Sequence, residues 1–226
     1  MARTGFFHHI GTFLLFCATV LLIITCISAP VVHDIGLMKV DLPGGRQTVS
    51  FGTFGYCVYD PSGASCSRSQ VGYDAAAVMQ AVDGTKFSDY AHSSTRDLTR
   101  AMILHPIACG LNFIAFLLAL GAGVVGSLLA SMVALLAFLI TVVIMIIDFV
   151  MFSIIRSNVN DQNNGSHAYY SAAAWTTLVS AICSLLGTIV VFFTCCSSRF
   201  HRQRNRDVVA PKNEYGTAAP RRRRWF

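Results

Sequence analysis

Two cysteines stand in a polar, glycine-rich stretch of an otherwise apolar chain. Cys57 and Cys66 are separated by eight residues that include the turn-forming run from Asp60 to Gly63. This pattern predicts two short strands joined at a hairpin, and a disulfide across them would remove about 2–3 kcal/mol of unfolded-state freedom. A pair of free thiols is the alternative. A zinc site is disfavoured, because two cysteines without nearby histidines supply half of a usual ligand set.

Four histidines could respond to pH. They lie in or beside the two polar segments that separate the apolar runs: His33, His92, His105 and His167. Imidazole changes its charge near about pH 6.5, so these side chains could register the pH of the medium. The favoured interpretation is nevertheless that they are ordinary surface residues of a weakly acidic loop region.

One carboxylate interrupts the longest apolar stretch. Asp148 is the only charged residue between positions 101 and 155. A carboxylate inside a membrane is costly and in many proteins marks a functional site. Residues 128–147 already supply enough apolar sequence to cross a bilayer, however. We therefore expect Asp148 to lie at the outer headgroup level, on a helix that protrudes from the membrane.

The elements that position these residues are long apolar segments. Only 12% of the chain is charged, about half the usual share of a soluble protein, which indicates an integral membrane protein. The segments long enough to span a bilayer as helices are residues 10–29, 101–121, 127–155 and 172–195. A cleaved signal peptide is disfavoured for the first, because Pro30 directly follows Ala29, where cleavage would occur.

The distribution of charge predicts the topology. Nine basic residues follow position 198, whereas residues 31–100 carry six basic and seven acidic residues. The positive-inside rule then places segments 1–9, 122–126 and 196–226 in the cytoplasm and loops 30–100 and 156–171 outside. Two further features agree: Asn164 begins an N-glycosylation sequon, and a Cys57–Cys66 disulfide persists only in an oxidising compartment.

The remainder of the first loop is expected to be partly helical. Residues 73–82 have the composition of a short helix, and the pair Asp83-Gly84 should end it. Residues 88–99 are strongly polar, so we expect a mobile connection there.

Small residues recur at helical spacing in the second and third spans. Ala115, Ala119 and Gly123 are four apart, and Ala130 and Ala134 repeat the pattern. Small side chains let helices approach closely in lipid. Packing within the bundle is favoured over a partner helix, because the turn at 122–126 is so short that the two spans must be antiparallel neighbours.

The last segment carries candidate lipid-contacting residues. Cys195 and Cys196 lie at the cytoplasmic end of the fourth span and are candidates for palmitoylation, with free thiols as the alternative. A basic tail follows, in which anionic lipid or a protein partner could bind Arg199, Arg202, Arg204, Arg206, Arg221, Arg222, Arg223 and Arg224. Nucleic acid is disfavoured as a partner. The common nucleotide-binding, metalloprotease and serine-hydrolase motifs are missing from the sequence, so we expect no enzyme activity and no cofactor.

The chain resembles the claudin-like tetraspan superfamily and, within it, the fungal PalI family of ambient-pH response proteins and their relatives from cortical patches (eisosomes). The resemblance centres on the loop motif formed by Gly52, Gly55, Tyr56 and the cysteine pair. Matching stretches are RTGFFHHIGTFLLF (3–16), ISAPVV (27–32), FGTFGYCVYD (51–60), LHPIACGLNFIAFLLALGAGVVGSLLAS (104–131), SHAYY (166–170) and VVFFTCCSSR (190–199).

The resemblance implies a four-transmembrane-helix bundle, all-α in class, topped by a small disulfide-stapled antiparallel β-sheet in the first extracellular loop. It implies a non-enzymatic plasma-membrane protein that assists a larger seven-span pH sensor. Apart from the resemblance, a second copy of the chain could be a partner, in a homo-oligomer. Organisation of cortical membrane domains, with effects on the cell wall, is the alternative, and a claudin-like pore or barrier is a second. The chain departs from animal claudins in lacking their loop tryptophan, and from some PalI proteins in lacking a very long tail.

Overall fold

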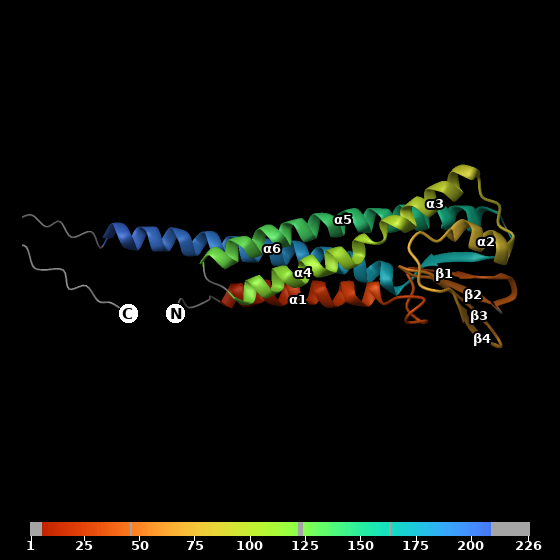
Figure 1. Ribbon diagram of the computed structural model, residues 1–226, viewed down its shortest axis with the longest axis horizontal. Coiled ribbons are helices and arrows are strands. Elements are labelled where there is room, and N and C mark those ends of the chain that lie inside the picture. Colours follow the sequence, from red (N-terminus) through yellow and green to blue (C-terminus); the bar gives the residue numbers. More distant parts are fainter. Residues whose placement is uncertain (1–5, 46, 122–123, 163, 209–226) are drawn as a thin grey trace, which may run out of the picture.

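The structure, a computed structural model, describes residues 6–45, 47–121, 124–162 and 164–208. Four helices in this part of the chain are long and apolar enough to cross a membrane, and we treat the protein as a multi-pass membrane protein. They lie in α1 (Phe6–Cys26), in the stretch Asp89–Leu120 that ends with α4 (Leu104–Leu120), in α5 (Val124–Asp161) and in α6 (Ala172–Val208). Figure 1 shows them side by side along the long axis, with α1 beginning and α6 ending at the same end.

Helix packing in the bundle depends on small residues. α1 packs against α6 and α4, and α5 packs against α4 and α6. Alanines on facing helices are buried at these crossings, among them Ala18, Ala108 and Ala137. The bulky apolar side chains point outward, as Phe13, Leu136 and many others do. Lipid is as apolar as a leucine side chain, so close approach between helices, rather than burial of large side chains, favours this arrangement.

A folded unit sits on one end of the bundle. We call it the cap, meaning the described residues of 27–101 and 162–171. It contains a sheet and two helices, which Figure 1 shows at the end remote from the start of α1. The cap elements are β1 (Met38–Asp41), the 3-10 turn η1 (Pro43–Gly45), β2 (Thr48–Phe51), β3 (Tyr56–Asp60), β4 (Gly63–Cys66), α2 (Ala75–Asp83), α3 (Asp89–Ala101) and β5 (His167–Tyr170).

Within the described residues, five strands form one antiparallel sheet in the order β4-β3-β2-β1-β5. The predicted hairpin is β3 and β4, in which Cys57 faces Cys66 and the disulfide is formed. At its turn, one carboxylate oxygen of Asp60 accepts hydrogen bonds from the backbone amides of Ser62 and Gly63, at 2.8 and 3.0 Å. The expected small sheet and its disulfide are therefore confirmed. The sequence analysis did not foresee β5, which comes from the second loop.

The first helix of the cap forms where local signals predicted it. Asp74 caps the start of α2 by accepting a hydrogen bond from the amide of Ala77 at 2.9 Å, and Gly84 ends the helix in the left-handed conformation. The buried face of α2 carries Ala75, Ala76 and Met79.

The expectation of a mobile connection at 88–99 is wrong, because this segment is helix α3. Ser88 caps its start, and Ala91, Thr95 and Thr99 lie four apart on a buried face. The face is made of small and hydroxyl-bearing residues, and it packs on α5 and α2. Side-chain hydroxyls of Thr95 and Thr99 bond to carbonyl oxygens at 2.9 and 2.6 Å. The buried face of α3 is thus formed by small and polar residues. The sequence therefore lacks the regular spacing of apolar residues from which a helix would have been predicted.

The cap and the bundle share one hydrophobic core. The last turns of α5 enter the cap: Met151, Phe152 and Ile155 are fully buried among cap residues such as Phe51 and Met79, and the helix continues to Asp161, beyond the predicted end of the third span at 155. α5 also contacts α3 and β5. The cap is therefore fixed to the bundle through the projecting end of α5 and is not a separate domain on a linker.

Candidate functional site at the junction of cap and bundle

The glycines of the loop motif lie where the sheet meets the end of α1. A Cβ atom at Gly52 would lie 2.6 and 2.8 Å from the backbone nitrogen and carbon of Ala29, and closer still to its carbonyl oxygen. At Gly55 it would collide with the hydroxyl of Ser67 and lie 3.1 Å from Cδ of Pro30. Gly52 requires glycine because two backbone segments approach each other there, whereas at Gly55 the space is occupied by the side chains of Ser67 and Pro30.

Between these glycines, Thr53 attaches the motif to α1. Its backbone amide donates to the hydroxyl of Ser28 at 3.0 Å, and its own hydroxyl donates to the carbonyl oxygen of Thr25 at 2.8 Å. Thr25 also lies 3.0 Å, oxygen to oxygen, from the hydroxyl of Thr176 on α6. The carbonyl oxygen of Thr25 also accepts from the backbone amide of Ser28 at 3.2 Å, so the motif adds a second donor at the end of α1.

An aromatic cluster packs beside the loop motif. The rings of Phe51, Tyr56 and Tyr73 lie 6.2–6.5 Å apart between centroids. Tyr73 is buried, and its hydroxyl donates to the carbonyl oxygen of Gly52 at 2.8 Å. Burial raises the pKa of the Tyr73 phenol, and the charge of Asp148 raises it further. Tyr73 therefore remains protonated and keeps this hydrogen bond.

Directly beneath the cap, the structure brings Asp148 of α5 against His105 of α4. Oδ2 of Asp148 lies 3.2 Å from Nε2 of His105, and both side chains are almost completely buried. The other ring nitrogen of His105, Nδ1, lies 3.1 Å from the carbonyl oxygen of Met102. Such a pair can hold a proton in an environment from which water is excluded.

This arrangement corrects two expectations. His105 is not a surface residue, since none of its surface is exposed. Asp148 is on a helix that protrudes, as expected, but the carboxylate faces the interior of the protein and not the headgroup region. Both errors have one cause: residues 105 and 148 are far apart in the sequence, and only helix packing decides which faces of α4 and α5 meet.

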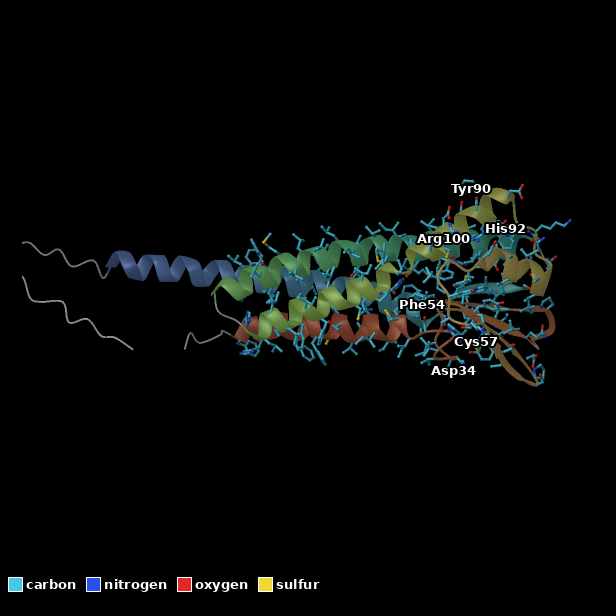
Figure 2. The ribbon with its side chains drawn as sticks, viewed as in Figure 1. Asp34, Phe54, Cys57, Tyr90, His92 and Arg100 are labelled. Carbon is cyan, nitrogen blue, oxygen red and sulfur yellow. A yellow bond between two sulfur atoms is a disulfide. The ribbon has the colours of Figure 1, made fainter. Side chains whose placement is uncertain are left out.

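The other histidines differ in their surroundings. His33 and His167 are exposed, whereas His92 is partly buried and lies 3.3 Å from Asp74 and 3.1 Å from Gln80. Figure 2 shows His92 on the α3 side of the cap, away from Cys57. His33 lies within 4.8 Å of both sulfurs of the disulfide, but oxidised sulfurs offer no thiolate to a metal.

The sequence analysis overlooked His8, which lies on α1 near the opposite end of the bundle. Its Nε2 lies 3.0 Å from the carbonyl oxygen of Ala119, in the last turn of α4. His8 is buried and bonds to a carbonyl oxygen at the end of a helix. The contact depends on the packing of α1 against α4, and nothing in the sequence that flanks His8 distinguishes it from the exposed histidines.

The predicted glycosylation site lies on the cap. Asn164 is exposed, whereas the hydroxyl of Ser166 in the same sequon donates to Asp83 at 2.6 Å. Gly165 between them adopts a positive φ of 81°, which turns the chain back toward β5. The asparagine side chain is therefore accessible to solvent beside a fixed part of the sheet.

The small-residue face of the second span lies inside the bundle. Ala115 and Ala119 are buried with Ala130, Ala134 and Leu15. Gly123, the third member of the predicted series, lies outside the described residues. This face is therefore occupied by α5 and α1 of the same chain along its described length.

For the cysteines and arginines predicted to contact lipid, the structure describes at most the backbone. Helix α6 continues past position 195 to Val208 and thus includes the backbone of Cys195, Cys196, Arg199, Arg202, Arg204 and Arg206. Arg221, Arg222, Arg223 and Arg224 lie outside the described residues. Palmitoylation and lipid binding at these positions stay predictions.

Comparison with known proteins agrees with this architecture. The model of the SUR7/PalI family matches residues 7–200, which include the cap, α4, α5 and most of α1 and α6. The chain belongs to the SUR7/PalI family. Within this family it is similar to the pH-response regulator protein palI/prr-5 of Neurospora crassa, with 27% identity over 204 residues, or 89% of this chain.

Other relatives match about half of the chain. The pH-response regulator protein palI/RIM9 of Pyricularia oryzae is 32% identical over 109 residues, and the uncharacterized membrane protein TOS7 of Saccharomyces cerevisiae is 33% identical over 102 residues. This SUR7/PalI chain spans 27% of the Neurospora protein's length, 14% of the Pyricularia protein's and 16% of the Saccharomyces protein's. The shared part is thus a fraction of each relative.

Proposed function

We propose that this SUR7/PalI protein is a non-enzymatic plasma-membrane accessory protein that assists a larger membrane sensor in the response to alkaline ambient pH. The observation that carries the proposal is the family match over residues 7–200, together with relatives that are named pH-response regulators. The role in pH response follows from this kinship, and the accessory mechanism is our inference.

The arrangement of the site supports a function through contacts. The hydrogen bonds of His105 go to Asp148 and Met102, so this pair has the form of a buried structural or proton-holding group and not of a nucleophile with its base. The cap is fixed to the bundle by a shared core. A rigid cap on a lipid-facing bundle is suited to docking against another membrane protein, for which a seven-span sensor is our proposed partner.

The proposed orientation places the cap outside the cell and both termini in the cytoplasm. The disulfide and the exposed Asn164 both belong to the cap, and each is compatible with the oxidising, glycosylating side of the secretory pathway. The basic residues after position 198 would then face anionic cytoplasmic lipid.

The test combines genetics with purification. A strain without this gene should grow normally in acidic medium and poorly in alkaline medium, and the full chain, purified in mild detergent from cells, should retain a multi-span membrane protein required for the same alkaline growth. Normal alkaline growth of the deletion strain would contradict the proposal. If the tagged chain instead formed stable, immobile patches at the cell cortex and its deletion altered only the cell wall, the alternative role of organising membrane domains would replace it.

A further inference from the structure

We infer that the base of the cap is set into the bilayer leaflet nearest to it, with Val31 and Val71 at the boundary between headgroups and acyl chains. The partner is lipid, which contacts two loops outside the membrane-spanning helices. These are residues 27–32, which follow α1, and residues 67–72, which lie between β4 and α2. The inference goes beyond the function proposed above and is the same for either orientation of the cap.

The exposed aliphatic side chains of the cap are unevenly distributed. Within the described residues of the cap, the valines, leucines, isoleucines and methionines are buried or half-buried with three exceptions, Ile27, Val31 and Val71. Val31 is 60% exposed and Val71 is 50% exposed. Single exposed aliphatic residues scattered over a surface are normal, whereas several at one place mark a contact with lipid or protein.

The first loop lies on the end of α1. The backbone amide of Val31 donates to the carbonyl oxygen of Ser28 at 3.2 Å, and the amide of Val32 donates to that of Ile27 at 3.0 Å. The chain therefore turns tightly just after the helix ends at Cys26, and Val31 stays near that end. Figure 1 shows this red loop at the junction of the bundle and the cap.

The second loop passes between the end of α1 and the end of α3. The amide of Gln70 donates to the carbonyl oxygen of Phe54 at 2.8 Å, and the preceding Thr53 bonds to the last turn of α1. On the other side, a Cβ atom at Gly72 would lie 2.5 Å from Cγ of Arg100, in the last turn of α3. Val71, between Gln70 and Gly72, therefore also lies at the base of the cap.

These loops continue a surface that lipid already covers. Ile27 is exposed just after α1, and Ile103 and Ile107 are exposed at the bend before α4 and in its first turn. α1 and α4 pack against each other, so these isoleucines belong to the lipid-facing side of two neighbouring helices. Val31 and Val71 lie beside them, and the occupant that the arrangement favours is therefore the surrounding lipid.

An exposed tryptophan marks the level of the membrane boundary. Trp175, in the first turn of α6, is 53% exposed, and its ring lies 6.4 Å from that of Phe149 between centroids. Phe149 follows Asp148, which contacts His105 in the first turn of α4. Exposed tryptophan is typical of the boundary between headgroups and acyl chains. This boundary therefore crosses α4 near its first turn, beside the two loops.

Helix lengths explain why one side of the cap rests on lipid. α5 continues to Asp161 and supplies Met151 and Phe152 to the cap core. α1 instead ends at Cys26, so the chain on that side enters the cap as a loop. No long helix on the α1 side, among the described residues, fills the space below this part of the cap.

Charged side chains limit how deeply the loops enter. Asp34 follows Val31 by three residues, Arg68 precedes Val71 by three, and Arg100 lies against the second loop; all three are exposed. Such charges are stable among headgroups and costly among acyl chains. Both signs are present, so the contact suits zwitterionic lipid and has no need of an anionic one.

The test uses tryptophan fluorescence of the full chain in nanodiscs of phosphatidylcholine, one chain to a disc, which leave both membrane faces open to water. Trp175→Phe and Trp225→Phe remove the native tryptophans, and Val71→Trp introduces the probe. The matched control is Tyr90→Trp in the same background. Tyr90 is 79% exposed, and Figure 2 shows it at the end of α3 opposite to Arg100.

Two quenchers then report the surroundings of each probe. Lipid brominated on the acyl chain just below the headgroup should quench most of the Val71→Trp fluorescence, and aqueous iodide should quench little of it. Tyr90→Trp should show the reverse. If iodide quenches both probes equally, the base of the cap is in water and the inference is overturned. Protection of position 71 from both quenchers also overturns it, because the protein's own residues would then cover the loop.

A measurement on the unsubstituted chain covers the case in which the tryptophan variants do not fold. In nanodiscs with isotope-labelled valine methyl groups, a nitroxide lipid should broaden the NMR signals of Val31 and Val71, and a water-soluble gadolinium chelate should leave them sharp. Val31→Ala and Val71→Ala assign these signals by their disappearance. Broadening by the chelate without broadening by the lipid overturns the inference.

Discussion

A single methyl group added at Gly52 should detach the cap from the end of α1. In Gly52→Ala, the new Cβ would lie 2.6 Å from the backbone nitrogen of Ala29 and 2.8 Å from its carbonyl carbon. These neighbours are backbone atoms and cannot rotate away as a flexible side chain can. Either the loop or the end of the helix must therefore move.

The hydrogen bonds that meet at this point determine the magnitude. Movement of Gly52 strains the hydrogen bond from its backbone amide to the carbonyl oxygen of Gly55, at 2.8 Å, and the hydrogen bond that its carbonyl oxygen accepts from Tyr73. It also strains the two hydrogen bonds that Thr53 donates at the end of α1. Each is worth about 1 kcal/mol net, so we expect a loss of about 2–4 kcal/mol in the free energy of unfolding. For a chain of this length that corresponds to a fall in Tm of roughly 5–15 °C.

The assay is thermal unfolding of the purified protein in mild detergent, with Gly110→Ala as the matched control. Gly110 lies in α4, and a Cβ there would have no atom within 4 Å, so this substitution should leave Tm unchanged or raise it slightly. A Gly52→Ala protein as stable as the Gly110→Ala protein would falsify the close approach between the motif and α1, and with it our explanation of the motif glycines.

Three further substitutions test other parts of the structure. Cys66→Ser should leave the buried Cys57 as a thiol that a maleimide labels in the denatured protein without prior reduction, and should destabilise the cap by about 2–3 kcal/mol; a Cys57 that stays unlabelled after denaturation would mean that it pairs elsewhere. Asn164→Gln should remove one endoglycosidase-sensitive shift in gel mobility if the cap faces outward, whereas identical mobility of the two proteins before and after the enzyme would argue against that orientation. Ala115→Leu overpacks the buried helix contact and should lower the free energy of unfolding by about 1–3 kcal/mol, while Leu117→Ala, at an exposed position of the same helix, should change it little; equal effects would contradict the helix packing.

Local sequence signals determined the elements whose causes lie within a few neighbouring residues. The four apolar segments predicted the long helices, because crossing lipid demands about twenty apolar residues wherever they pack. The turn at Asp60 and the paired cysteines predicted β3 and β4, and the cap of α2 follows from Asp74 and Gly84. In each case the interaction that stabilises the element joins residues close together in the chain.

Pairings between distant segments required the tertiary structure. Val40 of β1 pairs with Ala168 of β5, and nothing in the short run His167–Tyr170 distinguishes a strand that joins this sheet from an irregular loop. Helix α3 shows the same limitation in another form, since Thr95 and Thr99 become core residues only because α5 projects into the cap beside them.

The candidate site itself is decided entirely by packing. His105 and Asp148 were both visible in the sequence, one as a histidine of a polar loop region and the other as an isolated carboxylate. Their charges and hydrogen bonds depend on the faces that α4 and α5 present to each other, and each helix alone permits any rotation about its axis. Composition therefore establishes that helices cross a membrane, whereas only their mutual packing establishes which polar groups are buried against each other.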